Sequence, residues 1–376
     1  AVQAQCLALN KVFVEVGRLA PGKLQQVPVV VQGEEDAGTS AFTIDLAEKF
    51  VAEHFDRMKR SLLSQNRLNS SKALKDARSA LIEQLDLAKC TREIEQVRVM
   101  SAAASAFVAM GQLPKKLNPV IRSIMDSIKT EDIEYLQHRS ANAVADLIET
   151  CSTSGKIVAV DKLIKNLCRF LCVDTSESPE FFRNESLKDI ILSLKRDEER
   201  GPKDTLNREA EVKAARIKRR GAQFALAELC TRFGGDLLSK VPKLHECMIQ
   251  PLTANFALPD HVQHFEPEVG QDIVDSLSIL RSLIPQIHHD LHPQIIEVFP
   301  HIIKALESTF SVIRHAAARG FAAICKYIPI KGLQIVIETI LPMLNDADNV
   351  KRRQGAIEFI FCKHSFAALK LNLDLV

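Results

Sequence analysis

The sequence predicts an all-α protein, an α-solenoid of about seven to eight helical hairpins with inserted loops. Three observations point to this fold. Apolar residues recur every three or four positions along most of the 376 residues, as on the buried face of an amphipathic helix. A pair of small residues returns at intervals near 40 positions or multiples of 40. The chain has only 14 glycines, 15 prolines, two tyrosines and no tryptophan, which disfavours turn-rich all-β folds.

Two segments, residues 93–110 and 312–328, show the helical period most clearly. Their apolar positions are Ile94, Val97, Met100, Ala104, Phe107 and Val108 in the first, and Ile313, Ala317, Gly320, Ile324 and Ile328 in the second. Both segments are expected to be helices with one buried face. Only residues 27–31 (VPVVV) have the composition of a strand. Because a lone strand cannot satisfy its own backbone hydrogen bonds, we expect an apolar-lined loop there.

The repeat becomes visible when the small-residue pairs of the predicted second helices are aligned on the residue three positions earlier. The five copies are Arg98 with Ser101 and Ala102, Gln137 with Ser140 and Ala141, Lys218 with Gly221 and Ala222, Arg314 with Ala317 and Ala318, and Arg352 with Gly355 and Ala356. They are separated by 39, 81, 96 and 38 residues, and the gap of 96 exceeds twice 40 by the length of one insertion. A period of about 40 residues with two helices per unit is typical of HEAT and armadillo arrays.

Small residues at these positions have a physical reason. Ala and Gly allow neighbouring helices to approach closely, while the flanking Phe, Ile and Leu side chains fill the groove between them. The shorter first helices often carry a proline, which fits a first turn and bends a helix interior. These prolines are Pro119, Pro242, Pro300 and Pro342.

We expect residues 1–376 to form a single solenoid and to be a fragment of a longer chain. The predicted helix pairs are 76–110, 116–150, 157–232, 240–289, 291–328 and 333–362, with 1–20 as an orphan second helix and 43–66 as a first helix. Insertions are expected near 21–42, 173–208 and 254–270, where polar or turn-forming residues gather. Insertions in a solenoid emerge at one edge, where function is often located.

Charge and cysteine usage exclude several classes of protein. The 49 basic and 47 acidic residues give a net charge of +2, which does not predict binding to nucleic acid or to an anionic membrane. Nine scattered cysteines, mostly in apolar runs, predict a reducing compartment, the cytosol or the nucleus. No apolar stretch approaches the roughly 18 residues that span a bilayer, so no membrane partner is expected.

Three segments superficially match nucleotide-binding motifs. Residues 17–24 (GRLAPGKL) match a phosphate loop as far as Lys23, but Leu24 stands where Ser or Thr must hold Mg²⁺. Residues 154–156 (SGK) lack the flanking residues of that loop. Residues 197–200 (DEER) resemble an ATPase metal-binding box, yet they lie in a polar insertion without a preceding apolar strand. We predict no cofactor site, and a solvated helix face at 197–200.

The segment HHDLH holds the densest group of possible metal ligands. It contains His288, His289, Asp290 and His292, of which His288 and His292 would share a helix face as zinc ligands sometimes do. Pro293 follows at once, so we expect one helix to end and another to begin here. Imidazoles at helix ends commonly cap carbonyls or face solvent. We therefore predict no metal site.

Two further groups have a structural and a functional interpretation. Cys168 and Cys172 lie four residues apart in an apolar helix and are predicted to be buried structural thiols. A basic run opens a second helix and is predicted to be an exposed face balanced by Glu209 and Glu211. Contact with an acidic partner or with DNA phosphates is the alternative. The run comprises Lys213, Arg216, Lys218, Arg219 and Arg220.

No nucleophile with a base and an orienting acid is evident, so no catalytic residues are predicted and partner-binding residues stay unassigned.

Five strings carry more information than periodicity: residues 97–132, 162–181, 217–252, 310–328 and 340–358, with 113–119 (LPKKLNP) the most specific. In this order and at these separations, they resemble the HEAT-repeat region of the modifier-of-transcription family. Members of that family are TATA-binding-protein-associated factors that carry a Swi/Snf-type ATPase.

This resemblance implies a nuclear, curved solenoid that binds TATA-binding protein. In the family the solenoid is joined to a C-terminal motor that uses ATP and Mg²⁺ to remove TATA-binding protein from promoter DNA. This chain shows no ATPase motif, so we expect it not to be an enzyme. Residues 362–376 (CKHSFAALKLNLDLV) depart from the family pattern, and the family's inhibitory latch is not identifiable, so no contact residues are transferred. The competing hypothesis is a HEAT-repeat adaptor of the karyopherin or phosphatase-scaffold kind.

Overall fold

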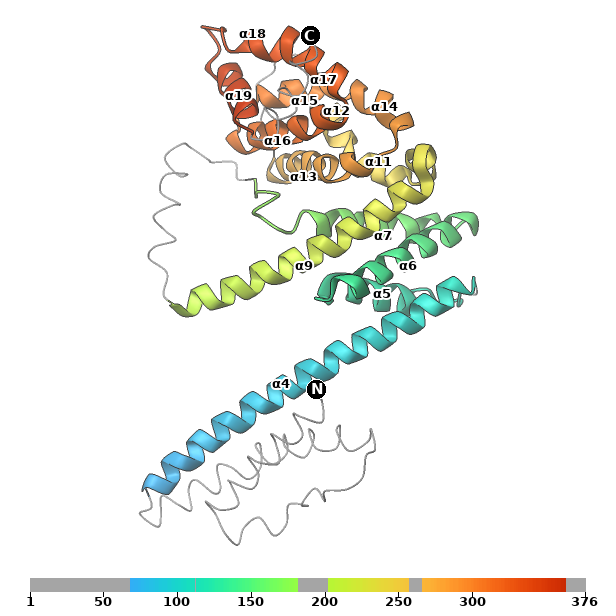
Figure 1. The fold of residues 1–376 in the computed structure, drawn as a ribbon, viewed down its shortest axis with the longest axis vertical. Coiled ribbons are helices and arrows are strands. Elements are labelled where there is room, and N and C mark those ends of the chain that lie inside the picture. Colours follow the sequence, from blue (N-terminus) through green and yellow to red (C-terminus); the bar gives the residue numbers. More distant parts are fainter. Residues whose placement is uncertain (1–67, 112, 182–201, 257–265, 363–376) are drawn as a thin grey trace. The chain divides into compact units, whose positions relative to one another are not determined.

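The structure is a computed structural model that describes residues 68–111, 113–181, 202–256 and 266–362 (Figure 1). It divides into two compact units, residues 1–100 and 101–376, and each is described by itself. Every regular element in the described part is helical. The segments predicted as a helix at 1–20, a loop at 21–42 and a helix at 43–66 lie outside the described residues, as does the strand-like run at 27–31.

The described part of the first unit belongs to one long helix, α4 (Leu68–Ala109), which continues into the second unit. The prediction of a helix pair at 76–110 is therefore wrong. No glycine or proline interrupts residues 68–109, and Ala, Leu, Lys and Glu, which favour helix, are frequent there. The helix ends before Gly111, whose φ of 68° is the left-handed conformation that commonly terminates helices.

The remaining helices all belong to the second unit. The first of them are α5 (Asn118–Thr130), α6 (Glu134–Thr153), α7 (Ile157–Leu171), α9 (Pro202–Phe233), η1 (Gly234–Asp236), α10 (Leu237–Lys240), α11 (Pro242–Met248) and α12 (Gln250–Phe256). The chain continues with α13 (Pro267–Leu283), η2 (Ile284–Gln286), η3 (His289–Leu291), α14 (His292–Glu297), α15 (Phe299–Leu306) and α16 (Ser311–Tyr327). It ends with α17 (Pro329–Ile335), η4 (Val336–Ile340), α18 (Leu341–Met343) and α19 (Val350–Phe361).

The helices of the second unit pack in two layers (Figure 1). In one layer the longer helices follow each other in chain order: α6 packs on α9, α9 on α13, α13 on α16 and α16 on α19. In the other, α7 packs on α11 and α12 packs on α15. Shorter helices also contact neighbouring longer ones, as α5 contacts both α6 and α9. The apolar core lies between the layers.

Two boundaries differ from the prediction. α9 begins at Pro202 and α13 at Pro267, inside the segments predicted as insertions at 173–208 and 254–270. Proline suits the first turn of a helix because the amide hydrogen that it lacks would have no intrahelical partner there. Of the two predicted insertions, residues 182–201 and 257–265 lie outside the described part.

Three phenylalanines connect α15, α16 and α19 through the core. Phe299 of α15, Phe321 of α16 and Phe359 of α19 are all almost completely buried. The rings of Phe299 and Phe321 meet edge to face at 5.2 Å, and those of Phe321 and Phe359 lie 5.5 Å apart. Edge-to-face pairs of this kind add to the stabilisation from burial because the ring edge is positive and the face negative.

The small residues occupy close helix contacts, as the sequence predicts. A Cβ built on Gly221 of α9 would overlap the carbonyl oxygen of Ile128 at the end of α5. A Cβ on Gly355 of α19 would overlap the carbonyl oxygen of Leu306, at the end of α15. Both aligned glycines thus contact the last turn of an earlier shorter helix. The expectation that small side chains permit this approach is confirmed at these two positions.

Prolines begin helices more often than they bend them. Pro119, Pro242 and Pro300 lie in the first turns of α5, α11 and α15. Pro342 lies within the continuous helical run from α17 to α18, and the π-helix η4 precedes it. A π turn relieves the clash that a proline makes with the preceding turn of an α-helix. None of the described helices combines the length and apolar character needed to cross a membrane.

Candidate functional site

The nucleotide-binding look-alikes give no site in the described residues. Residues 17–24 and 197–200 lie outside the described part. Within 154–156, Gly155 has a φ of 70°, and the Lys156 amide donates to the Cys151 carbonyl at 2.9 Å. This hydrogen bond reaches back over five residues to close the end of α6, as in a Schellman motif. The glycine therefore ends a helix, as it would in many proteins with no phosphate ligand.

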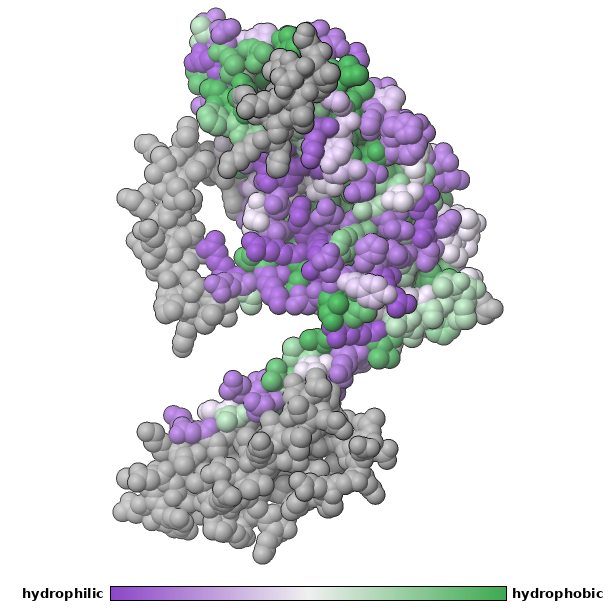
Figure 2. Space-filling model, in the orientation of Figure 1, coloured by the Kyte–Doolittle hydropathy of each residue, from purple (hydrophilic) through white to green (hydrophobic). Residues whose placement is uncertain are grey.

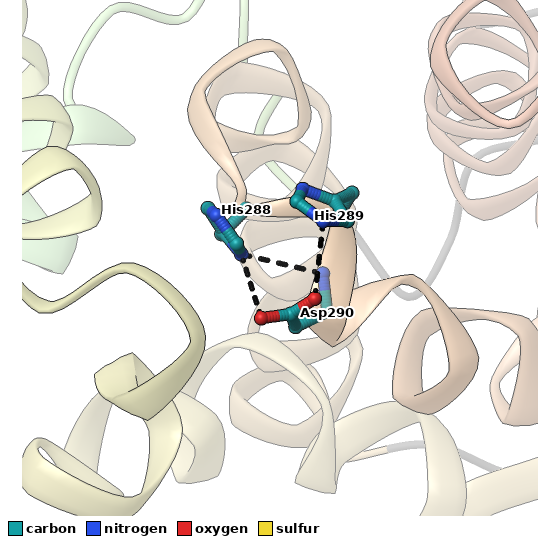
Figure 3. A group of neighbouring side chains, drawn as sticks. All are labelled: His288, His289 and Asp290. Carbon is teal, nitrogen blue, oxygen red and sulfur yellow. Dashed lines mark hydrogen bonds and ion pairs between the residues drawn. The ribbon is translucent and has the colours of Figure 1, made fainter.

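One helical run ends and another begins at the histidine cluster, as the sequence predicts, because η2 ends at Gln286 and α14 begins at His292. His288 is in extended conformation, so it shares no helix face with His292, which begins α14. Figure 3 shows that the neighbouring side chains are those of His288, His289 and Asp290, whose potential ligand atoms lie within 4.8 Å of one another. One Asp290 oxygen lies 3.2 Å from His288 Nδ1, and the other lies 3.2 Å from His289 Nε2. These exposed contacts pair the three side chains with each other.

Cys168 and Cys172 have the burial and the raised pKa values of unreactive thiols. Cys168 is buried, as predicted, and Cys172 is half-buried. A hydrogen bond to Cys247 of α11, together with burial, raises the pKa of the Cys168 thiol. Burial also raises the pKa of Cys172, whose Sγ donates to the Asp275 carbonyl at 3.7 Å. Raised pKa values favour the thiol over the reactive thiolate, so these residues resemble structural thiols.

Two residues of the basic run, Lys213 and Arg220, contact the turn between α5 and α6. Lys213 pairs with Asp132 at 2.9 Å, and Arg220 Nη2 donates to the Asp132 carbonyl at 2.8 Å. The ion-pair partner of Lys213 is thus in another helical hairpin, and not Glu209 or Glu211 as predicted.

The aligned polar positions also have structural roles. Buried Gln137 donates from Nε2 to the carbonyls of Ile128 and Ile217, each at 2.8 Å, and so joins α6 to α5 and α9. Arg314, also buried, donates to the Ser308 carbonyl at 2.9 Å in the turn before α16. A buried polar group must be hydrogen-bonded to be tolerated, and these groups use turn and helix-end carbonyls. They stabilise the stacking of helices.

Arg219, another residue of the basic run, lines a groove together with basic side chains from other helices. Four longer helices, α9, α13, α16 and α19, together enclose a groove of about 710 Å³. Its basic side chains are Arg219 of α9, Arg281 of α13, and Arg319 and Lys326 of α16. We call this surface the basic groove. Its carboxylates are Glu177 and Glu358, so the lining carries more positive than negative charge.

A carboxylate already occupies one part of the basic groove. Glu177, in the segment after α7, pairs with Arg281 Nη2 at 2.5 Å and with Arg319 Nη2 at 2.8 Å. The segment is anchored near Phe181, whose amide donates to Gln271 Oε1 at 2.7 Å. The described part of the predicted insertion therefore contributes Glu177 to the groove.

Electrostatics within the groove follow from crowding of like charges. Burial alone would raise the pKa of Glu177, but Arg281 and Arg319 outweigh it and hold that pKa below its usual value. Burial, and then the neighbouring Arg319, lower the pKa of Arg281. Desolvation, followed by the same two arginines, lowers the pKa of His315. The guanidinium groups thus repel one another, and an anion between them relieves this repulsion.

One groove cation lacks part of its hydrogen bonding. The Nε of Arg219 is buried and has no hydrogen-bond partner, while its Nη2 reaches Ser282 Oγ only at 3.4 Å. A buried donor without an acceptor costs about 1 to 3 kcal/mol. Two apolar side chains of α19, Ile357 and Phe361, also line the groove, and they are 45% and 78% exposed.

Figure 2 shows how polar and apolar surface is distributed on one face of the second unit. Hydrophilic residues dominate over α9 and α13, and apolar residues gather near the end that carries α19. Sequence reasoning identified Arg219 as part of a basic run, but it missed Arg281, Arg319 and Glu177. These residues lie on the polar faces of different helices or in the segment after α7. The sequence shows each polar face, but it does not show which of these faces lie side by side.

Comparison with known proteins gives a consistent result. The model of a family described as a domain of unknown function, DUF3535, matches residues 1–247. A TATA-binding protein-associated factor mot1 of Aspergillus fumigatus is 42% identical over 363 residues, which are 96% of this chain and 19% of the relative. The factor MOT1 of Saccharomyces cerevisiae is 35% identical over 96% of this chain and 19% of its own length. The human TATA-binding protein-associated factor 172 is 28% identical over 72% of this chain. The chain therefore spans about a fifth of the length of the fungal relatives.

Proposed function

Because the chain belongs to the modifier-of-transcription family of TATA-binding-protein-associated factors and carries its DUF3535 domain, we propose that it is a scaffold that binds TATA-binding protein. In the longer protein, the scaffold helps to displace TATA-binding protein from promoter DNA. The observation that carries the proposal is 42% identity to a TATA-binding protein-associated factor over 96% of this chain. Sequences this similar over this length share their fold.

The scaffold is proposed to be a HEAT-repeat solenoid. Two features support this architecture. The helices of the second unit form two layers in chain order, and the aligned Gly221 and Gly355 contact equivalent helix ends. In a solenoid each repeat contacts its neighbours, so a load applied at one end is passed along the stack. The buried polar contacts of Gln137 and Arg314 resist sliding between helices because moving them would leave buried groups unpaired.

The proposed mechanism separates binding from energy supply. The scaffold holds TATA-binding protein through turns at one edge, and an ATP-dependent motor elsewhere in the longer protein supplies the work of displacement. ATP and Mg²⁺ are assigned to that motor, and this chain is proposed not to hydrolyse ATP. Work on a promoter complex requires residence in the nucleus. In this mechanism the scaffold contacts TATA-binding protein, and promoter DNA is a partner only indirectly or through the motor.

A binding measurement with the purified chain tests the proposal. Immobilised residues 1–376 should retain purified TATA-binding protein in a saturable manner, in biolayer interferometry at physiological salt. The matched control is the same chain carrying Ala317→Glu, which disrupts the stack and should lose retention. Absence of retention by the folded chain, with binding instead to a small GTPase, a cargo peptide or a phosphatase catalytic subunit, would support the adaptor hypothesis. An ATPase assay completes the test, because hydrolysis abolished by Lys23→Ala would restore the phosphate-loop interpretation.

A further inference from the structure

We propose that the basic groove is a second interaction surface, which binds an acidic peptide segment of a partner protein by placing carboxylates between its guanidinium groups. This inference goes beyond the proposed binding of TATA-binding protein and does not depend on it. It rests on three properties of the groove: a carboxylate that already uses it, donors that are still available, and an apolar wall beside them.

The first property is the contact of Glu177. Its carboxylate accepts from Arg281 and Arg319 at 2.5 and 2.8 Å, so the groove holds a carboxylate between two guanidinium groups. Charge-assisted hydrogen bonds of this kind are the stronger ones in proteins. The chain thus contains an internal example of the ligand chemistry that the groove accepts.

The second property is the unused capacity of the groove. Glu177 pairs with Arg281 and Arg319, whereas Arg219 makes only a long contact, from Nη2 to Ser282 Oγ at 3.4 Å. Lys326 also lines the groove, and its described contact is with the ring of Tyr327 at 5.6 Å. Glu358 offers little competition at the far wall because its Oε1 accepts from Arg314 at 3.2 Å. Cationic donors therefore exceed the carboxylates that the groove supplies.

The third property decides between a peptide and DNA. Ile357 and Phe361 give the groove an exposed apolar wall, which favours a ligand that alternates acidic and apolar side chains. Roughly half to two-thirds of protein–DNA hydrogen bonds go to phosphates and sugars, and an apolar wall does not stabilise such contacts. An extended peptide fits a recess of about 710 Å³ better than a rigid duplex does.

Fluorescence anisotropy with a defined probe tests the proposal. The probe is a fluorescein-labelled peptide of alternating glutamate and leucine, titrated with the full chain, and the matched peptide has glutamine in place of glutamate. We expect saturable binding of the acidic peptide alone. The double variant Arg219→Gln with Lys326→Gln should weaken binding about tenfold, the size expected for loss of two charge-assisted contacts. Thermal melting should show that the variants stay folded.

Two further variants make the test specific. Glu177→Gln removes the internal carboxylate and should strengthen peptide binding several-fold, because Arg281 and Arg319 become available. A loss of two charges outside the groove, Arg216→Gln with Lys351→Gln, should leave binding unchanged, since both residues are exposed on other surfaces. A purely structural role for the groove arginines predicts no gain from Glu177→Gln.

Several outcomes would overturn the proposal. Equal weakening by the groove and control variants would indicate unspecific attraction between charges, as would binding of the glutamine peptide. Duplex DNA that competes with the peptide and loses affinity in the same groove variants would make the groove a phosphate site. Peptide binding that is seen only after residues 183–200 are deleted would assign the groove to that segment of the chain itself.

Discussion

Replacing Gly221 by alanine is the sharpest test of the close helix contact in the second unit. The new Cβ would overlap the Ile128 carbonyl oxygen and lie 2.5 Å from Gln137 Nε2. Alanine by itself favours helix over glycine by about 1 kcal/mol. Overpacking against a backbone atom costs about 3 kcal/mol, the upper end of the usual range, because a carbonyl cannot rotate away. Displacing Gln137 from that carbonyl costs about 1 kcal/mol more. We therefore expect a net destabilisation of about 3 kcal/mol.

Gly320 provides a matched control on α16. A Cβ there would meet its nearest atom, the Leu277 carbonyl oxygen, at 3.6 Å, which is ordinary van der Waals contact. Gly320→Ala should therefore stabilise the chain by about 0.5 to 1 kcal/mol through helix propensity and reduced freedom of the unfolded chain. Urea unfolding followed by circular dichroism at the helix band measures both variants. An unfolding midpoint of Gly221→Ala equal to or above that of Gly320→Ala would refute the assigned contact.

Three other substitutions are expected to change stability. Ala317→Glu, which buries an unpaired carboxylate at a position with 0% exposure, should cost about 3 to 5 kcal/mol, and an unchanged melting temperature would contradict the packing. Burial, only partly offset by Gln271, raises the pKa of Asp275 to about 6, so the ionised carboxylate opposes folding above that pH. Asp275→Asn should then stabilise the chain at pH 8 by about 2 kcal/mol, and the gain should shrink as pH falls towards 4; a gain independent of pH would contradict the assignment. Glu177→Gln should cost about 1 kcal/mol at neutral pH, and because its pKa is lowered in the folded chain, the variants should converge in acid as the wild-type carboxylate is protonated. Chemical denaturation at several pH values separates these cases.

Some features could be predicted from the sequence because they depend on neighbours in the chain. Pro119, Pro242 and Pro300 lie in the first turns of helices, and Gly155 ends one, since each residue restricts or frees its own backbone. The alignment of Gly221 with Gly355 anticipated a shared close contact. The prediction failed for α4, where a helix pair was expected, although no glycine or proline interrupts residues 68–109.

The amino-acid order by itself determined the helical character of the chain, the places where many helices begin, and the family to which it belongs. Tertiary structure decided which polar side chains share a surface. Glu177 reaches Arg281 and Arg319 across sequence separations of 104 and 142 residues, and no pattern within one helix encodes that meeting. It arises because the apolar faces of successive helices must be buried against each other, and that packing turns their opposite faces towards a common groove.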